Sequence, residues 1–433
     1  MNSVLAHGLG DGAELPVDPM FIAWGAGLVV LISFAAFGVL WEKPRLVDAS
    51  SGRSLPSRAT TAAAAAAVAG RVLAGGVYVV TISTAFTGSR FVVLNAAPWV
   101  VLIGVAVVMP IVSLLFGDVW RAVSPLRTLA SLAELAGARA GILRRRELSD
   151  WPAAIALAAF AWYELAYHSP ASPRVLAWLL LIYSAWAVLP AAIYGNEWTD
   201  RADGLGWWFS AIATMSCWTK ADDGVRIRRP FIGAVNFTAK AGSVIAILVV
   251  LGATTFDGVS RTQFWGDIIG DRIGWGATGL RTLGLVWTIA IVVALYLGAS
   301  RRTDELVVGG RAADSFVPML LPIAFGYAIA HTFAALIFDG QTMLIRASDP
   351  YGDGSNWFGT ADWIENTRLL AATTIAWVQI VAVVGGHVVA TMLAHDRAVA
   401  LTDNHEDAVR SQYAMVMVMI VFTAAGLLLL VDG

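Results

Sequence analysis

The chain has 433 residues, of which 58% are hydrophobic and 14% are charged, and its mean hydropathy is +0.69. Soluble domains carry about 25% charged residues, so this composition excludes an ordinary soluble protein. The net charge is −2, and we expect no nucleic-acid partner. The single Cys217 excludes an internal disulfide and a CxxC site. The sequence also lacks the Walker A, GxSxG and HExxH motifs, so ATP hydrolysis through a Walker A loop is excluded.

Ten apolar segments follow one another along the chain. Continuous runs of about 18 or more apolar residues are typical of transmembrane helices, whereas membrane strands alternate over about ten residues. The predicted spans are 20–41, 64–87, 97–117, 151–168, 174–194, 237–256, 280–299, 316–338, 368–394 and 411–431. We therefore predict an all-α polytopic transmembrane helix bundle, a single integral membrane domain over 1–433, in the lipid bilayer of the cell membrane. The first span is too long for the core of a cleaved signal peptide, so we expect it to remain as an anchor.

The Lys and Arg residues are divided unevenly between the two sets of loops. Counted with the span ends beside them, the loop after the first span and every second loop from there hold 21 of the 29, the remaining segments hold seven, and Arg71 lies deeper within a span. Because positively charged loops stay in the cytoplasm, this pattern predicts an outside N-terminus, with residues 1–19 as an extracytoplasmic segment. Residues 195–236 then form a cytoplasmic loop, and residues 339–366 form an outer loop.

One apolar segment of the cytoplasmic loop is too short to be a span. Residues 204–218 contain two adjacent tryptophans and Cys217 but number only 15, and charged residues flank them on both sides. Apolar stretches of this length are typical of re-entrant or interfacial helices. We predict such a helix here, because a further crossing would invert every later loop.

The ten spans divide into two halves of five with opposite orientation, as in transporters built from inverted repeats. The third span of each half ends in a similar way, with LLFGDVWRAVSP at 114–125 and LIFDGQTMLIRASDP at 336–350. A 5+5 inverted repeat and a chance similarity of two span ends both stay open as explanations.

Five ionisable residues are predicted to lie within the membrane. A charge in a span costs roughly 2.5–3.5 kcal/mol at the helix centre, so it needs a partner or a wet cavity. Glu164 and Arg71 are predicted either to pair with each other or, for Glu164, to carry a proton. His331, His387 and His395 are candidates for proton transfer or for binding a metal or haem. A neutral histidine bonded to a neighbouring carbonyl is the structural alternative for each.

The outer side offers acidic candidates. Asp257 ends the sixth span, and the loop that begins at Asp339 contains five acidic residues among Gly, Pro, Asn and Trp. A loop ordered by turns is the simpler interpretation, and cation capture is the alternative. His7 is predicted to face the same side. The spacing of these residues matches no EF-hand, so we predict no metal site from it.

The inner side carries two basic segments, 116–127 and 144–146. Basic and aromatic side chains at span ends anchor helices to anionic lipid and set their orientation. We interpret both segments in this way.

Several short motifs resemble an actinobacterial family of integral membrane proteins often labelled fenitrothion hydrolase. They are AHGLG at 6–10, WEKPRL at 41–46, TFDGVSRT at 255–262, AHTF at 330–333, DGQ at 339–341, SDPYG at 348–352, FGTAD at 358–362, GH at 386–387 and AHDRA at 394–398. The resemblance covers nearly the whole chain and implies a shared fold and topology. It also marks His331, Asp257, Gln341, His387 and His395 as residues to test.

Three functions are compatible with these observations. An ion- or proton-coupled transporter or permease of an unknown small molecule or ion is favoured by ten spans and by ionisable groups at membrane depth. A redox or metal-binding membrane protein is the alternative, in which haem or copper is the cofactor of the histidines. A membrane-bound hydrolase is the second alternative, as the family label implies. A subunit of a larger membrane complex also fits the sequence.

Overall fold

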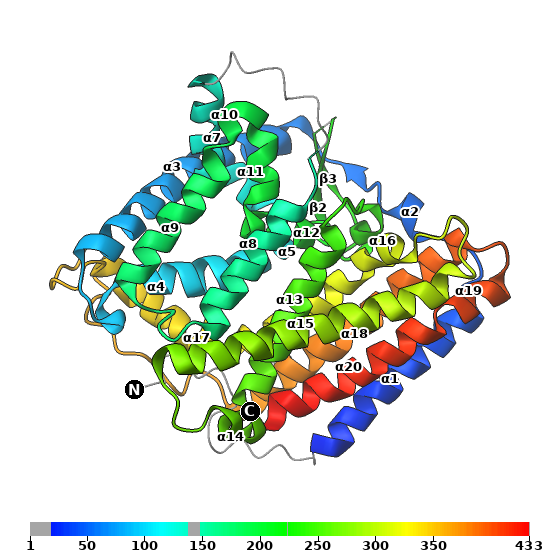
Figure 1. Cartoon of the computed structure of the whole chain (residues 1–433). Helices are drawn as coiled ribbons and strands as arrows, with labels where there is room; N and C mark the ends of the chain where they lie inside the picture. The colour runs from blue at the N-terminus through cyan, green and yellow to red at the C-terminus, as the bar shows by residue number, and fades with distance from the viewer. Residues whose placement is uncertain (1–18, 137–147, 223, 433) are drawn as a thin grey trace.

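Long apolar helices run side by side through the protein (Figure 1). The computed structural model describes residues 19–136, 148–222 and 224–432. Within these residues, nine helical segments are long and apolar enough to cross a membrane, and a tenth, Trp151–Ala166, is shorter. The predicted all-α polytopic bundle is therefore confirmed. His7, with the rest of residues 1–18, and the basic segment 144–146 lie outside the described residues.

The helices that make up the ten segments often follow one another without a loop. In chain order they are α1 (Pro19–Leu40), α3 (Ser57–Thr87), α4 (Ala96–Trp99), the π-helix η2 (Val100–Val108), α5 (Met109–Phe116), α8 (Trp151–Ala161), the π-helix η3 (Trp162–Ala166), α9 (Pro173–Val188), α10 (Ala191–Tyr194), α13 (Ser243–Arg261), α15 (Gly274–Asp304), α16 (Ala312–Phe316), the 3₁₀-helix η5 (Val317–Leu320), α17 (Leu321–Ser348), α18 (Ala372–Leu401), α19 (His405–Ser411) and α20 (Tyr413–Asp432). Helices suit these sequences because each helical segment bonds its own backbone groups in lipid.

Short elements connect the long helices. They are α2 (Leu46–Ala49), β1 (Arg53–Ser54), the 3₁₀-helix η1 (Val92–Leu94), α6 (Val119–Val123), α7 (Pro125–Ala136), α11 (Asn196–Ala202), α12 (Gly204–Ala213), β2 (Trp218–Ala221), β3 (Gly224–Ile227), the 3₁₀-helix η4 (Ile232–Asn236) and α14 (Gln263–Ile269). The strands form one antiparallel sheet in the order β1-β3-β2, in which Ile227 lies opposite both Arg53 and Trp218.

The short apolar helix of the 195–236 segment is α12. It has ten residues, about 15 Å of helix, so it cannot cross a hydrocarbon core of about 30 Å. Eight of its residues are buried, and it packs against α5 and α8. The prediction of a helix too short to cross is therefore confirmed, and the helix ends at Ala213 rather than at 218.

Two helix ends differ from the predicted span boundaries. The sixth span begins at Ser243 rather than at 237, because Gly242 takes a φ of 101° and starts α13 there. The helix of the eighth predicted span, α17, continues to Ser348, so the first ten residues of the segment predicted as an outer loop are helical. The two segments that suggested an inverted repeat therefore differ in conformation: Gly117 ends α5 with a φ of 84°, whereas Gly340 lies within α17. They give the repeat no support.

Close approach of α17 and α18 depends on two glycines. A Cβ atom on Gly326 would lie 2.4 Å from the Ala382 carbonyl oxygen, and one on Gly386 would lie 2.5 Å from the Pro322 oxygen. Small residues at such crossings let helix backbones pack directly on one another, which is how membrane helices associate without a hydrophobic driving force. Gly386 thereby places its neighbour His387 in the centre of the bundle, where that histidine is fully buried.

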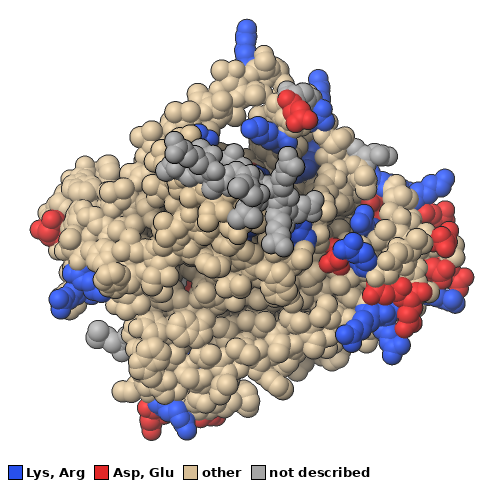
Figure 2. All heavy atoms as spheres, turned by 45° about the horizontal axis from the view of Figure 1, so that its top comes forward, with Lys and Arg blue, Asp and Glu red and all other residues tan. Residues whose placement is uncertain are grey.

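The charged residues concentrate away from the middle of the bundle. Figure 2 shows them mainly around the edges of the face it presents, with a broad middle that lacks them. Large apolar side chains that include Phe21, Trp178 and Trp287 are more than half exposed, as expected for side chains that contact lipid. We call the end of the bundle that carries α2, α7, α11, α19 and the sheet the basic end, and the end that carries α14 and residues 349–371 the acidic end (Figure 1).

Candidate functional site

A cavity of about 690 Å³ opens at the basic end. It lies within the range of roughly 300–1,000 Å³ that is typical of small-molecule sites. Its lining comes from the α5–α7 connection and from α11, α12 and the residues after η4. The charged and polar side chains among its lining residues are Asp118, Trp120, Arg121, Ser124, Arg127, Glu197, Thr199, Asp200, Arg201, Asp203, Trp207, Ser210, Thr214 and Thr238.

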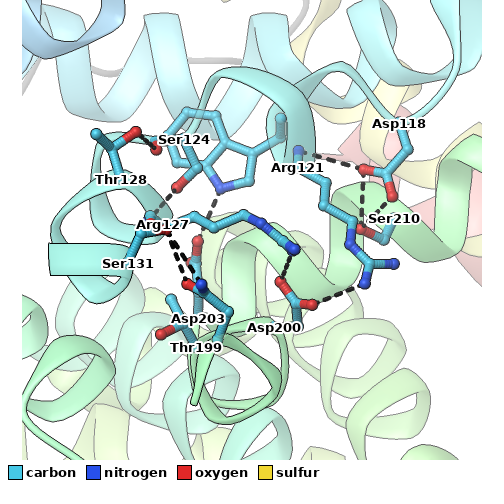
Figure 3. Close-up of polar contacts among 12 residues, drawn as sticks. Asp118, Arg121, Ser124, Arg127, Thr128, Ser131, Thr199, Asp200, Asp203 and Ser210 are labelled. Carbon is cyan, nitrogen blue, oxygen red and sulfur yellow. Dashed lines mark hydrogen bonds and ion pairs between the residues drawn. The ribbon is translucent and has the colours of Figure 1, made fainter. Parts of the chain in front are cut away.

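Two arginines of this basic-end cavity share one carboxylate (Figure 3). Arg121 Nη2 lies 2.8 Å from Asp200 Oδ2, and Arg127 Nη1 pairs with Asp200 Oδ1. The arginines approach from α6 and α7, whereas Asp200 comes from α11. The Arg121 side chain is 55% exposed and that of Arg127 is 30% exposed. The pair therefore presents two accessible guanidinium groups against one carboxylate.

Asp203 closes the deep side of the cavity. Its carboxylate accepts hydrogen bonds from Trp120 Nε1 at 2.7 Å, from the Tyr183 hydroxyl at 2.6 Å and from Gly206 N at 3.0 Å. The last of these caps the N-terminus of α12. Burial raises the pKa of Asp203, although these hydrogen bonds oppose the rise. A Cβ on Gly206 would lie 2.4 Å from Asp203 Oδ2, so glycine is required beside this carboxylate.

Asp118 occupies a second carboxylate position in the cavity. The Ser210 hydroxyl lies 3.0 Å from both of its oxygens, and Arg121 N donates to Oδ1 at 3.3 Å as the cap of α6. Burial raises the pKa of Asp118, while Ser210 and the charge of Arg121 oppose the rise. Asp118 and Asp203 thus accept their hydrogen bonds from neutral groups.

Asp150 joins the starts of α8 and α13 beside the cavity. Its side chain is 1% exposed and pairs with Arg201, which lines the cavity. The Ser243 hydroxyl donates to its other oxygen, and its backbone N–H donates to the Ala241 oxygen at 2.7 Å. One arginine therefore matches one buried carboxylate at this end of the two helices.

An apolar layer separates the cavity from the acidic end. Asp150 precedes Glu164 by 14 residues, and Ser243 precedes Asp257 by the same number, which in helix corresponds to about 21 Å. The interval is filled by buried apolar side chains that α8, α12 and α13 contribute, namely Ala153, Ala154, Leu157, Trp207, Phe209, Ala246, Ile247, Leu248 and Val249. The polar residues at the two ends of this helix pair are therefore separated by apolar side chains.

A cluster of four ionisable residues lies beyond this layer, and we call it the acidic-end cluster. Asp257 Oδ2 lies 2.7 Å from Arg261 Nη2 and 3.3 Å from His331 Nδ1. Glu164 interacts electrostatically with both Asp257 and Arg261. The side chain of His331 is 6% exposed and that of Asp257 is 23% exposed. Within the described residues His331 Nδ1 has no hydrogen-bond partner of good geometry, so this nitrogen faces a carboxylate without a fixed bond to it.

The acidic-end cluster brings together three residues predicted from sequence: Glu164, Asp257 and His331. Glu164 lies in η3, and π-turns of this kind often occur at functional sites. The predicted pair between Arg71 and Glu164 is wrong. Arg71 Nε instead donates to the Ala122 oxygen at 2.7 Å, which fixes α3 to α6.

The other two predicted histidines each lie within hydrogen-bond distance of a backbone carbonyl. His387 Nδ1 lies 2.9 Å from the Val383 oxygen, one turn earlier in α18. His395 Nε2 lies 3.0 Å from the Trp41 oxygen, and its Nδ1 lies 3.1 Å from Gln412 Nε2. His395 therefore joins the end of α18 to the exit of α1. These two histidines are thus separate from the acidic-end cluster.

The candidates of the segment predicted as an outer loop hold that segment in place. Gln341 Nε2 donates to the Ile337 oxygen at 2.9 Å, and its Oε1 accepts from Asn366 N at the same distance. Asp339 interacts electrostatically with Glu365. Asp349 accepts from the backbone of the residues that follow it, which is turn geometry. In the part of the chain that the structure describes, no group of three or more His, Cys, Asp and Glu residues is placed to hold a metal ion.

Sequence reasoning missed the basic-end cavity. The sequence predicts a lipid anchor at 116–127, yet Asp118, Arg121 and Arg127 line a cavity. A local signal was present, since an aspartate directly precedes two short helices, at Asp118 and at Asp203. Aspartate at such positions caps helices, and a capped short helix among spans indicates a broken, functional segment.

Comparison with known proteins gives no assignment. No protein-family model, no curated protein and no solved structure matches this chain. The resemblance to the family labelled fenitrothion hydrolase therefore stays a prediction.

Proposed function

We propose that this membrane protein is a proton- or ion-coupled transporter of a small solute. The observation that carries the proposal is the acidic-end cluster, in which two carboxylates and a histidine meet one arginine within helices of membrane-spanning type. Ionisable groups at such depth are costly and mark ion or proton routes. The basic-end cavity supplies the second part, a polar chamber for a solute.

The charge balance of the acidic-end cluster supports proton coupling. Glu164 and Asp257 bring two negative charges and Arg261 brings one positive charge, so the four residues together need one more proton to be neutral. That proton fits on His331 or on a carboxylate. Binding and release of the proton would change the net charge between α13 and α17. Because a net charge in a low-dielectric environment is strongly disfavoured, this change would alter how the two helices pack.

The position of the cavity supports a solute route from the other side. Its wall contains α12, a short helix that starts at a buried aspartate inside the bundle. Transporters commonly place substrates at the ends of such discontinuous helices. With an outside N-terminus, as the distribution of Lys and Arg predicts, this cavity faces the cytoplasm and the acidic-end cluster faces outward. The apolar layer between them then acts as the barrier.

The test is solute-driven proton movement in proteoliposomes that contain a pH-sensitive dye. Amino acids, dipeptides, carboxylates, sugars and nucleosides are added as separate pools without an imposed proton gradient. We expect one pool to change the internal pH, and we expect Asp257→Asn to reduce that rate at least tenfold. The amide oxygen of the substituted side chain would still accept a hydrogen bond from Arg261, so the variant retains the packing of α13.

The matched control is Asp314→Asn, which removes an exposed aspartate paired with Arg311 at 2.8 Å. This variant should transport like the unaltered protein. The proposal would be contradicted if none of the pools caused proton movement, or if a folded Asp257→Asn protein kept full activity.

A further inference from the structure

We propose that the solute held by the basic-end cavity is a small zwitterion that carries both an amine and an acid group. The inference deepens the proposed function and rests on it, because it assigns the substrate class of the cavity that the proposed transporter would use. It depends on which charges of the cavity wall are already matched and which are not.

The wall has a surplus of positive charge at one place. Arg121 and Arg127 share Asp200, which leaves this group of three with one net positive charge. Both guanidinium groups are accessible, with side-chain exposures of 55% and 30%. Guanidinium groups bind carboxylates through paired, charge-assisted hydrogen bonds. A ligand carboxylate placed beside Asp200 would take up the donors that Asp200 leaves unused.

The wall has two further carboxylates next to this group, and neither is hydrogen-bonded to a charged side chain of the described residues. Asp203 accepts from an indole, a phenol and a backbone amide, and Asp118 accepts from a hydroxyl and a backbone amide. Hydrogen bonds from neutral groups solvate a carboxylate but leave its charge in place. An ammonium group would supply the missing positive charge, and Trp120 and Trp207 in the same wall suit a cation.

The mixture of signs argues against a ligand of one sign. The lining contains three arginines and four acidic residues. A simple anion would pair with Arg121 and Arg127 but would approach Asp118 and Asp203, and a simple cation would do the reverse. Like charges brought together on desolvation cost binding energy, whereas complementary signs set specificity. A zwitterion satisfies both sides of the cavity at once.

The first experiment is thermal unfolding of the detergent-purified protein with matched probes. Each of a panel of L-amino acids is compared with the amine that lacks its carboxylate and the acid that lacks its amine. We expect at least one amino acid to raise Tm and to bind at least tenfold more tightly than either analogue, since each lost charge removes a charge-assisted contact. An acid or an amine that binds as tightly as the amino acid would overturn the inference, and so would a panel in which nothing binds.

The second experiment uses variants that keep the shape of the wall. Arg127→Gln removes a positive charge, and Asp118→Asn removes a negative charge while it keeps an acceptor for Ser210 and a cap for α6. Each should weaken binding of the amino acid about tenfold. Arg311→Gln and Asp314→Asn, which alter an exposed pair elsewhere, should leave binding unchanged. If both cavity variants fold and bind like the unaltered protein, the cavity does not hold the amino acid.

The two proposals fail separately in these tests. Binding of a zwitterion without proton movement would keep the site and reject coupled transport. Proton movement driven by a sugar or a simple carboxylate, with no zwitterion binding, would keep coupled transport and reject this substrate class.

Discussion

The two ends of the α8–α13 helix pair differ in how completely their carboxylates are paired with positive charge. At the basic end, Asp150 is matched by Arg201 and held by Ser243. At the acidic end, Glu164 and Asp257 share Arg261, and His331 approaches without a good hydrogen bond. The matched pair fixes two helices in one arrangement. The unmatched set leaves room for a proton, so the difference separates a structural contact from a proposed coupling site.

The largest expected effect comes from removing the matched carboxylate. Asp150→Ala strands Arg201 and Ser243 beside a side-chain position that is 1% exposed, and loss of one partner of a buried pair costs about 3–5 kcal/mol. We expect a large drop in the Tm of the purified protein. Asp257→Asn should lower Tm much less, because that side chain is 23% exposed and keeps an acceptor. A larger drop for Asp257→Asn than for Asp150→Ala would contradict the comparison.

The next effect concerns the cavity that adjoins Asp150. Gly206→Ala places a Cβ 2.4 Å from Asp203 Oδ2 and 2.8 Å from Trp120 Cδ1, and forcing such atoms apart costs about 1–3 kcal/mol. We expect a lower Tm and loss of solute binding in the same variant. Gly279→Ala in α15 is the control, since its added Cβ meets nothing within 4 Å. If the two variants had the same Tm and the same solute binding, the residues around Gly206 would accommodate the added methyl group, which would contradict this prediction.

A smaller effect distinguishes two buried histidines. His331 faces Asp257 at 3.3 Å, whereas His395 bonds Trp41 and Gln412 at the other end. His331→Gln should change the pH profile of solute-driven proton flux, because it removes a titratable group from the acidic-end cluster. His395→Gln should lower Tm but keep the profile of the unaltered protein. A changed pH profile in the His395 variant would place proton transfer near His395 and contradict its assignment to the acidic-end cluster.

The smallest effect is a pH-dependent stability difference at Asp118. Burial raises its pKa above the ordinary value of 3.8, so the folded state binds this proton more tightly than the unfolded state. Stability therefore falls as pH rises through the interval from 3.8 to the raised pKa. Asp118→Asn lacks this dependence, so its Tm relative to the unaltered protein should rise from about pH 4 toward neutral pH. A difference that stays flat with pH would mean that the carboxylate is as well solvated folded as unfolded.

Much of the fold was predictable because hydropathy is a local property. Each of the ten predicted spans is a continuous apolar run, so each is visible without knowledge of its neighbours. The short α12 was also predictable, since charged residues flank an apolar segment too short to cross. Its burial was not, because that depends on contacts with α5 and α8, which lie 43 or more residues earlier in the chain.

The candidate site was predictable only in part, for the same reason. A charge within an apolar run is conspicuous, so Glu164, Asp257 and His331 are each visible in the sequence. Their meeting was not predictable, because Asp257 and His331 lie 74 residues apart. The cavity residues were harder to recognise, since Arg127 and Asp200 belong to two segments predicted as charged loops. Charged residues are ordinary in loops, and only the packing of α7 against α11 brings these together.

The most direct test measures solute exchange and proton flux in one preparation of Glu164→Gln. The variant removes a carboxylate from the acidic-end cluster and leaves the basic-end cavity unaltered. We predict that labelled solute still exchanges across the liposome membrane, whereas solute-driven proton flux is lost. Proton flux at the rate of the unaltered protein would contradict the account, and so would the joint loss of exchange and proton flux in a protein whose Tm is unchanged.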